Sequence, residues 1–404
     1  QGLSRKMGHP CSGRFRVGVL HTVKRRFRGS SYRRGAARAL RILLFSGVLA
    51  GLPDFYLTPA WAGPGAGAPA EWPIERWAGD QQAPVLAGSP PLTLTRITAS
   101  WPWRLCTVYP HLKDSYWLAV NFGMVEEARA LGIGLRVLEA AGYEHLDDQR
   151  ERVASCIADE ATDALLVGTV SFAGLNDLLG PYVARRPVLA LVNDIDSGVV
   201  SGKVGVPWYQ LGWKVGRWLA ERHPAGSAPV EIAWLPGPQD AGWVSFIDRG
   251  FREGIARSAV RIVAVSSGDT GRAIQRRLVE EVLDAHPEID YLVGNAPMAE
   301  VAIAELRRRG LENQVAIVSS YVTPGVYSGL LRGRILVSVT DFPVLQGRMA
   351  VRQALRALEG LALESHIGPE VELVDAELLR RYPIEWMLPP AGFVPVYEVK
   401  PGQR

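Results

Sequence analysis

Residues 105–139 read LCTVYPHLKDSYWLAVNFGMVEEARALGIGLRVLE, and this stretch decides the fold class. The apolar runs at 105–109 and 135–139 have the length of buried strands, and the segment 116–131 has the apolar spacing of a helix. A strand, a helix and a second strand in this order form a parallel pair with a right-handed crossover. Short, continuous apolar runs also indicate a sheet that is covered by helices on both faces.

The same alternation continues toward the C-terminus and restarts after residue 206. Further strands are predicted at 164–167, 188–192, 204–206, 231–235, 261–265, 291–293, 315–318, 335–339 and 394–399, and further helices at 146–160, 172–184, 207–223, 244–257, 272–285, 298–309, 324–331 and 343–359. The sequence therefore predicts an α/β protein with two doubly wound parallel-sheet lobes joined by hinge strands. Because ligands bind beyond the carboxyl ends of the strands in open α/β sheets, we expect a site between the lobes. The hinge candidates are 205–207, 339–341 and the terminal strand.

The N-terminal region predicts export. Residues 1–62 carry twelve Lys or Arg residues against one acidic residue, and an apolar segment at 42–52 is followed by Ala60-Trp61-Ala62. This order is typical of a signal peptide, and we place cleavage after Ala62. Residues 63–91 are rich in Gly, Pro and Ala, which predicts a flexible or extended stretch.

These features predict the domain organisation. We expect a basic extension plus signal peptide at 1–62, an extended N-terminal segment at 63–100, lobe 1 at 101–206 with 341–372, and lobe 2 at 207–340 with 373–404. The body after residue 62 has 33 basic against 40 acidic residues. This acidic balance argues against nucleic-acid binding, which depends on a basic face.

Two cysteines remain after the leader, Cys106 and Cys156. In an oxidising compartment such as the periplasm they can form a disulfide, or they can be two small buried apolar residues. The histidines are scattered, so the sequence predicts no metal site. G-x-S-x-G, P-loop and G-x-G-x-x-G motifs are absent, which favours binding without catalysis.

Aromatic residues follow the predicted strands, whereas cationic residues are scarce there. Tyr116 and Trp117 come after the first strand, Tyr143 after the second, Trp208 after the crossover and Tyr321 in the second lobe. Ring faces attract a methylated ammonium group, so these positions predict an aromatic box.

Each candidate also has a structural interpretation. Asp114 is placed to cap the following helix, Trp208 can belong to the core, and Asp341 can cap the last helix. Tyr143 lies in a loop and ranks above Trp243 as a ligand contact. Neighbouring helical positions point about 100° apart, so Tyr116 and Trp117 face one ligand only if the helix begins irregularly.

Long tracts of the chain carry a resemblance to a known family. They are YPHLKDSYW at 109–117, NFGMVE at 121–126, VLEAAGY at 137–143, GTV at 168–170, VPWYQLGW at 206–213, LPGP at 235–238, and parts of 286–294 and 325–333. Over roughly residues 101–397 the chain resembles the periplasmic trimethylamine N-oxide binding proteins, which have the type I periplasmic binding protein fold.

The resemblance implies a function and a set of site residues. Such a protein binds trimethylamine N-oxide in the cleft and signals to the periplasmic domain of a membrane sensor histidine kinase, which controls a respiratory reductase system. The matching pocket residues are Asp114, Tyr116, Trp117, Tyr143, Trp208 and Tyr321. The resemblance implies no catalytic residue, metal or cofactor, and membrane contact only through the kinase.

The family's ligand gives these residues roles. Rings of Trp117, Tyr143 and Trp208 would cover the methyl groups, and a tyrosine hydroxyl or an indole N–H would donate to the oxide. Asp114 would face the positive end or orient a ring donor. In this fold Cys106 lies on the first strand and Cys156 on the helix crossing over it, so a disulfide is geometrically reasonable.

Two other functions remain open from the sequence. One is an ABC-transporter substrate-binding protein for a sugar or another small solute. The other is a secreted hydrolase on the same fold.

Overall fold

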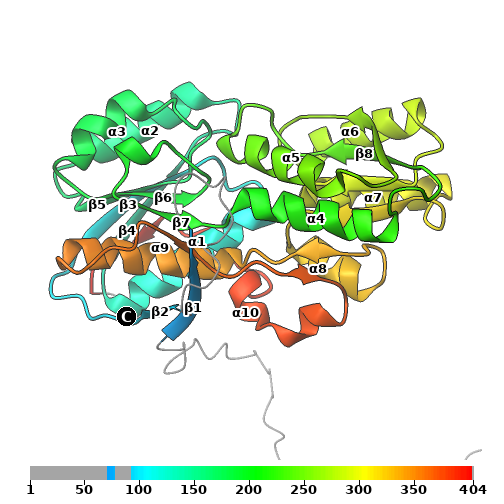
Figure 1. Cartoon of the computed structure of the whole chain (residues 1–404). Helices are drawn as coiled ribbons and strands as arrows, with labels where there is room; N and C mark the ends of the chain where they lie inside the picture. The colour runs from blue at the N-terminus through cyan, green and yellow to red at the C-terminus, as the bar shows by residue number, and fades with distance from the viewer. Residues whose placement is uncertain (1–70, 78–91, 403–404) are drawn as a thin grey trace, which may run out of the picture. The chain divides into compact units, whose positions relative to one another are not determined.

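The computed structural model describes residues 71–77 and 92–402 (Figure 1). The predicted leader, with its cleavage site after Ala62, lies outside the described residues. Two separate sheets organise the described part, one mainly parallel and one wholly parallel. The predicted fold class is therefore confirmed.

The first sheet has the strand order β15-β4-β3-β5-β6-β7-β13-β1-β2. Its strands are β1 (Glu71–Arg76), β2 (Leu92–Thr95), β3 (Arg104–Tyr109), β4 (Gly134–Glu139), β5 (Ala164–Val167), β6 (Val188–Val192), β7 (Gly202–Gly205), β13 (His366–Gly368) and β15 (Glu398–Val399). The strands from β4 to β13 run parallel, and the edge strands pair antiparallel. We call this sheet and its helices lobe 1.

Helices cover both faces of the first sheet, as Figure 1 shows. One face carries α1 (Ser115–Leu131) and α9 (Pro343–Leu358), which pack against each other. The other carries α2 (Leu146–Ala158) and α3 (Asn176–Val183). This two-sided cover explains why the central strands β5 and β6 are apolar and buried along their whole length.

The second sheet is all parallel, in the order β11-β10-β8-β9. Its strands are β8 (Val230–Leu235), β9 (Val260–Val265), β10 (Tyr291–Gly294) and β11 (Ala316–Ser319), and its helices are α4 (Trp208–Arg222), α5 (Gly242–Ile255), α6 (Arg272–Ala285), α7 (Ala296–Arg309) and α8 (Pro324–Leu331). We call this sheet and its helices lobe 2. Two short strands, β12 (Ser338–Val339) and β14 (Leu373–Val374), form an antiparallel pair that belongs to neither sheet. The short helix α10 (Ile384–Met387) packs on α9.

The chain passes from lobe 1 to lobe 2 at 205–208, from lobe 2 to lobe 1 at 339–343, and from lobe 1 to the β12–β14 pair at 368–373, before it returns to lobe 1 at β15. The middle passage contains Phe342 with a φ of 47°, a left-handed conformation that is unusual for a bulky residue. No helix within 71–77 and 92–402 is long and apolar enough to span a bilayer.

Two expectations about the chain ends need correction. Within the segment expected to be extended at 63–100, β1 and β2 form a hairpin that is built into the first sheet. The C-terminal strand β15 pairs with β4 and so belongs to lobe 1, although residues 373–404 were expected in lobe 2. Strand pairing, which depends on tertiary contacts, decided both cases.

Buried aromatic and charged groups attach the N-terminal hairpin. Trp72 on β1 is fully buried, and the guanidinium of Arg352 lies 3.4 Å from the centroid of its ring. The same guanidinium donates to Glu127 Oε1 at 2.7 Å and to the carbonyl of Leu94 at 3.1 Å. The hairpin therefore contributes to the core of lobe 1.

The structure contains a disulfide between Cys106 on β3 and Cys156 on α2, with a Cα–Cα distance of 5.9 Å. It fixes α2 on the face of the sheet away from α1. Both cysteines are fully buried.

Candidate ligand-binding site

A small cavity lies between the two lobes, at the carboxyl ends of the parallel strands. Nine residues line it: Asp114, Tyr116, Trp117, Tyr143, Asn193, Trp208, Trp243, Thr270 and Tyr321. All six residues predicted from the sequence are among them. Asn193, Trp243 and Thr270 are additional.

Aromatic rings from both lobes form most of the wall. Tyr321 lies edge-on to Tyr116, Trp208 and Trp243, with ring centroids 5.3, 6.2 and 6.3 Å apart. The rings of Trp208 and Trp243 are 4.9 Å apart. Rings held in edge-to-face contact stabilise one another and keep their faces in fixed directions.

Tyr116 and Trp117 both line the cavity although they are sequence neighbours. Their helix α1 begins regularly at Ser115, with Asp114 in extended backbone before it. The cavity lies beyond the N-terminus of the helix, so the first turn can present both side chains without an irregular start. The rings of this pair are inclined by 71°.

Asp114 caps α1, as considered for it, and it also lines the cavity. Its Oδ1 accepts from the backbone N–H of Trp117 at 3.1 Å and caps α1, and its Oδ2 accepts from the hydroxyl of Thr270 at 3.1 Å. Thr270 belongs to the loop after β9 in lobe 2. The carboxylate therefore links the two lobes while it lines the cavity.

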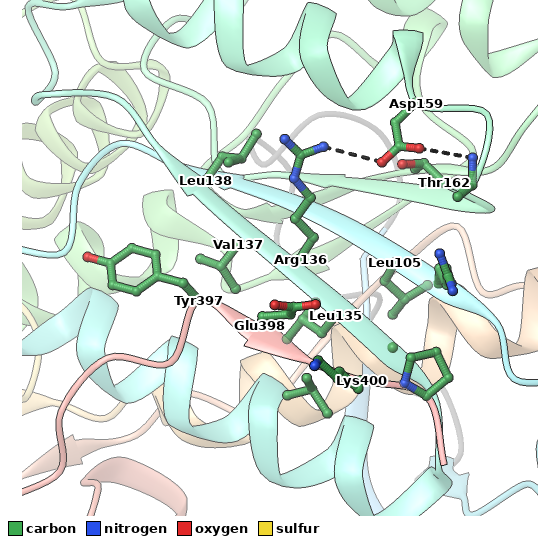
Figure 2. A pocket seen from close by; sticks show the side chains of 15 residues that line it. Leu105, Leu135, Arg136, Val137, Leu138, Asp159, Thr162, Tyr397, Glu398 and Lys400 are labelled. Atoms are coloured by element: carbon green, nitrogen blue, oxygen red, sulfur yellow. Dashed lines mark hydrogen bonds and ion pairs between the residues drawn. The ribbon is translucent and has the colours of Figure 1, made fainter. Parts of the chain in front are cut away.

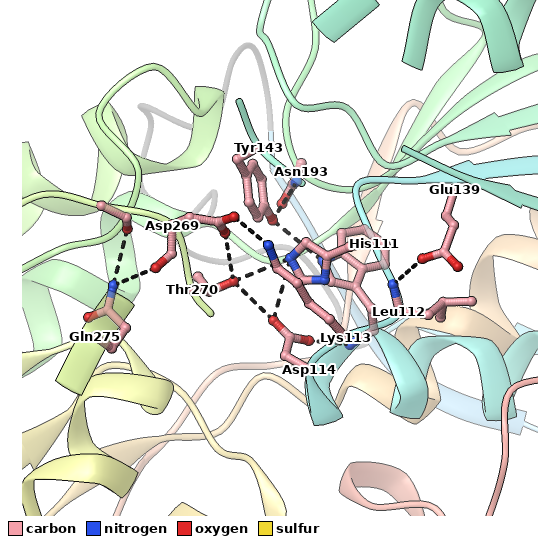
Figure 3. A network of polar contacts seen from close by, with 12 residues as sticks. His111, Leu112, Lys113, Asp114, Glu139, Tyr143, Asn193, Asp269, Thr270 and Gln275 are labelled. Atoms are coloured by element: carbon pink, nitrogen blue, oxygen red, sulfur yellow. Dashed lines mark hydrogen bonds and ion pairs between the residues drawn. The ribbon is translucent and has the colours of Figure 1, made fainter. Parts of the chain in front are cut away.

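A polar network continues this link across the cleft, as Figure 3 shows. Lys113 of lobe 1 forms an ion pair with Asp269 of lobe 2, and His111 Nε2 lies 3.3 Å from the Thr270 hydroxyl. Gln275 Nε2 donates to the carbonyl of Asp269 at 2.8 Å. Burial lowers the pKa of His111, so this imidazole is neutral at neutral pH.

Tyr143 is at the centre of a second network. Its hydroxyl oxygen accepts from Trp117 Nε1 at 3.4 Å and from Asn193 Nδ2 at 3.1 Å. Asn193 also donates to the carbonyl of Thr169 at 2.8 Å, which fixes its amide. Burial raises the pKa of the Tyr143 hydroxyl, so it stays protonated.

Asp341 lies behind the cavity wall and does not cap α9. The N-cap position of that helix is Phe342, and Asp341 Oδ1 instead accepts from the backbone N–H of Val322 at 3.4 Å. The carboxyl also interacts with the hydroxyl of Tyr116, which accepts from Gln346 Nε2 at 3.2 Å. Burial raises the pKa of Asp341 to about 7.

Two glycines make room for indole rings of the cavity. A Cβ atom at Gly168 would overlap the indole of Trp117, and a Cβ atom at Gly237 would lie 2.7 Å from that of Trp243. Gly237 also has a φ of 135°, which favours glycine. Both glycines lie in tracts that carry the family resemblance.

The additional residues differ in how visible they are in the sequence. Asn193 directly follows the buried strand β6, so its position after a strand was a usable signal. Trp243, which the sequence ranks below Tyr143 as a ligand contact, lies on α5, and Thr270, which it does not select, comes five positions after the end of β9. Only the packing of the lobes brings them to the cavity.

A larger pocket lies elsewhere, beside β15 (Figure 2). It is lined by the outer side of β3 and β4 and by the C-terminal residues, with Arg136 paired to Asp159 at 3.3 Å. It contains none of the predicted site residues. No cluster of potential metal ligands occurs among the described residues.

Comparison with known proteins shows to which family the chain belongs. It matches the family model described as periplasmic binding proteins and sugar binding domain of LacI family over residues 102–385. The periplasmic protein TorT of Escherichia coli (strain K12) is 39% identical over 360 residues, which cover 89% of this chain and 97% of that protein.

Solved structures agree with this result. A crystal structure of the TorS sensor domain–TorT complex in the presence of TMAO matches with 40% identity and a TM-score of 0.67, covering 73% of this chain and 99% of that chain. An ABC transporter solute binding protein from Bradyrhizobium sp. BTAi1 with bound bis-tris matches with 39% identity and a TM-score of 0.67, covering 82% and 98%. This chain therefore belongs to the type I periplasmic binding protein family.

Proposed function

We propose that this chain is a periplasmic sensor protein that binds trimethylamine N-oxide in the aromatic cavity and signals to the periplasmic domain of a membrane sensor histidine kinase, which controls the respiratory reductase system. The similarity to TorT extends over nearly the whole of that relative. The similar TorT structures are complexes with the TorS sensor domain, without ligand and with TMAO.

The observation that carries the proposal is the composition of the cavity wall. Six of its nine residues are aromatic, and none is Lys or Arg. In trimethylamine N-oxide the nitrogen and its methyl groups are positive, and ring faces attract such a group by about 0.5–2 kcal/mol per contact when water is excluded. Because the ligand is neutral overall, it needs no fixed cation in the site.

The proposal is one of binding without turnover and without a cofactor. The family consists of binding proteins. No Ser, Cys, His or Lys side chain lines the described cavity, and the Thr270 hydroxyl there donates to Asp114.

Isothermal titration of the purified protein with trimethylamine N-oxide tests the proposal. We expect saturable binding, and we expect Trp117→Ala to abolish it because the ring that packs beside Tyr143 is lost. Trp213→Ala is the matched control, since this tryptophan is exposed on α4 and does not line the cavity. Absence of heat at millimolar ligand, with the protein folded, would reject this ligand.

The partner is tested separately. We expect the periplasmic domain of its sensor histidine kinase to form a complex with this protein in analytical ultracentrifugation, with a stability that depends on trimethylamine N-oxide. Binding of the ligand without complex formation at micromolar concentrations would contradict the sensor role alone.

The similarity to the Bradyrhizobium protein supports a second candidate, a transport receptor. A sugar needs several polar partners, whereas this cavity offers only Asp114, Asn193 and Thr270 beside its tyrosine hydroxyls and indoles. The cavity therefore favours the amine oxide. A thermal-shift comparison in which pentoses stabilise the protein and amine oxides do not would favour the transport receptor.

A further inference from the structure

A hollow on the surface of lobe 2, between the neighbouring helices α7 and α8 (Figure 1), is rich in arginine. Its wall contains four basic residues and one acidic residue: Arg272, Arg307, Arg332, Arg334 and Glu300. We call it the arginine hollow. The body after residue 62 has more acidic than basic residues, so this local excess of positive charge runs against the balance of the chain.

The arginine hollow follows one face of α7. Four lining residues, which are three, four and seven positions apart, have the spacing of one helix face: Glu300, Ile303, Ala304 and Arg307. Arg272, at the start of α6, donates to Glu300 Oε2 at 2.6 Å. Because a helix rises about 1.5 Å per residue, Glu300 and Arg307 lie about 10 Å apart along the axis of α7. The basic wall is therefore a row rather than a single point of charge.

Most of this positive charge is not neutralised within the part of the chain that the structure describes. Three exposed guanidinium groups of the hollow form no ion pair with a described residue: those of Arg307, Arg332 and Arg334. The next two residues of α7 differ, because Arg308 and Arg309 both pair with Glu305 at 2.5 Å. The cations beside the hollow are thus paired, whereas those that line it are available to a partner.

Glu300 connects the arginine hollow with the loops of the ligand cavity. Its Oε1 accepts from the hydroxyl of Thr323 at 2.5 Å, while its Oε2 accepts from Arg272. Arg272 comes two residues after Thr270, and Thr323 comes two residues after Tyr321. Thr270 and Tyr321 line the cavity. The carboxylate is therefore already engaged on both oxygens, and a molecule in the hollow would lie against the same two loops that line the cavity.

We propose that the arginine hollow is a docking site for a protein partner, filled by a segment of that partner which carries several Asp or Glu side chains. Charge complementarity supports this occupant, because each guanidinium offers a planar pair of N–H donors that matches a carboxylate. A segment with several carboxylates can follow the row of cations along α7. Opposite charges on the two surfaces also speed the encounter of the partners. The inference goes beyond the proposed function, since it does not depend on which molecule fills the cavity.

Isothermal titration of the purified protein with a decapeptide of alternating Glu and Gly tests the proposal. A decapeptide with Gln in place of Glu is the neutral control. At low ionic strength we expect one acidic peptide to bind per protein and the neutral peptide not to bind. Raising sodium chloride to about 0.5 M is expected to weaken the binding strongly, because salt shortens the range over which exposed charges attract each other.

Variants locate the binding on the surface. Arg307→Gln, Arg332→Gln and Arg334→Gln are each expected to weaken binding of the acidic peptide roughly 2- to 5-fold, and the triple variant about 10- to 100-fold. The matched control removes three exposed arginines of lobe 2 that do not line the hollow: Arg257→Gln, Arg261→Gln and Arg276→Gln. Both triple variants lose the same net charge, and we expect only the first to lose affinity.

Three results would overturn the inference: no binding of the acidic peptide to folded wild-type protein, equal weakening in both triple variants, or displacement of the peptide by a single inorganic phosphate ion at constant ionic strength. The second would mean that only net charge matters, and the third that the hollow is a site for a small anion. Thermal unfolding of each variant verifies its fold. Titration with trimethylamine N-oxide is expected to be unchanged in both triple variants, so the inference and the proposed function can fail separately.

Discussion

Replacing Asp341 by asparagine removes a buried carboxyl group at the passage between the lobes and keeps its size. Asp341 is fully buried, and burial raises its pKa from 3.8 to about 7. Hydrogen bonding by Tyr116 and by the backbone N–H of Val322 opposes this shift only partly. The folded protein therefore holds the carboxyl proton more tightly than the unfolded chain does.

The sign and size of the effect follow from this difference. A raised pKa stabilises the fold fully below pH about 4, and this contribution disappears as the pH rises toward 7. Each pKa unit corresponds to about 1.4 kcal/mol, so the contribution of Asp341 to the free energy of unfolding changes by about 4 kcal/mol across this range. Asparagine does not titrate and lacks the change.

Urea unfolding at several pH values between 4 and 8 measures this contribution of Asp341 to the free energy of unfolding. The free energy of unfolding of the Asp341→Asn variant, minus that of the wild type, is expected to rise by up to about 1.4 kcal/mol per pH unit and to level off above pH 7. Taking the difference removes the contribution of Glu75, whose pKa burial also raises to about 7. Asp240→Asn, at an exposed position, is the control. A difference that stays constant with pH would refute the reasoning.

Three further changes follow from the structure. Lys113→Met removes the ion pair with Asp269 between the lobes. We expect titration to show ligand binding weakened roughly 5- to 30-fold, equivalent to about 1–2 kcal/mol, while the free energy of unfolding in urea changes little. Equal losses in binding free energy and in unfolding free energy would argue against a role of this ion pair in closure of the lobes. Gly168→Ala pushes a methyl group into the indole of Trp117, and we expect a loss of about 1–3 kcal/mol in unfolding free energy together with weaker binding, whereas a fully stable variant would mean that the indole can move. Reducing the disulfide of Cys106, which closes a 50-residue separation, is expected to cost about 4 kcal/mol in chemical unfolding, and an unchanged unfolding midpoint under reducing conditions would contradict this.

Much of the fold could be predicted because the pattern of apolar runs is a local property. The helix α6 begins and ends at the predicted residues 272 and 285, and β6 matches the predicted 188–192. The hairpin of β1 and β2 was not predicted, because the Gly, Pro and Ala content around it masked the alternation of Trp72 and Ile74. The partner of β15 could not be deduced, since pairing across about 260 residues leaves no local signal.

The site divides in the same way. Residues in the loops after strands, such as Tyr143 after β4 and Tyr321 after β11, could be selected because the carboxyl ends of parallel strands share one edge. Trp243 has the pattern of an ordinary core residue on α5. It lines the cavity only because lobe 2, which carries it, packs against lobe 1. The position of Asp341 behind Tyr116 likewise depends on how the passages between the lobes are packed.

The cavity wall is divided between the two lobes, with Tyr143 on one side and Trp243 and Tyr321 on the other. Neither half alone surrounds a small molecule. Binding of a molecule to one half and closure of the two halves around it are therefore separate steps. In the proposed sensor, a compound that covers the rings of one half but is too bulky for the other would keep the two halves apart and exclude the ligand. Steric bulk alone would then be enough to design an inhibitor of that sensor.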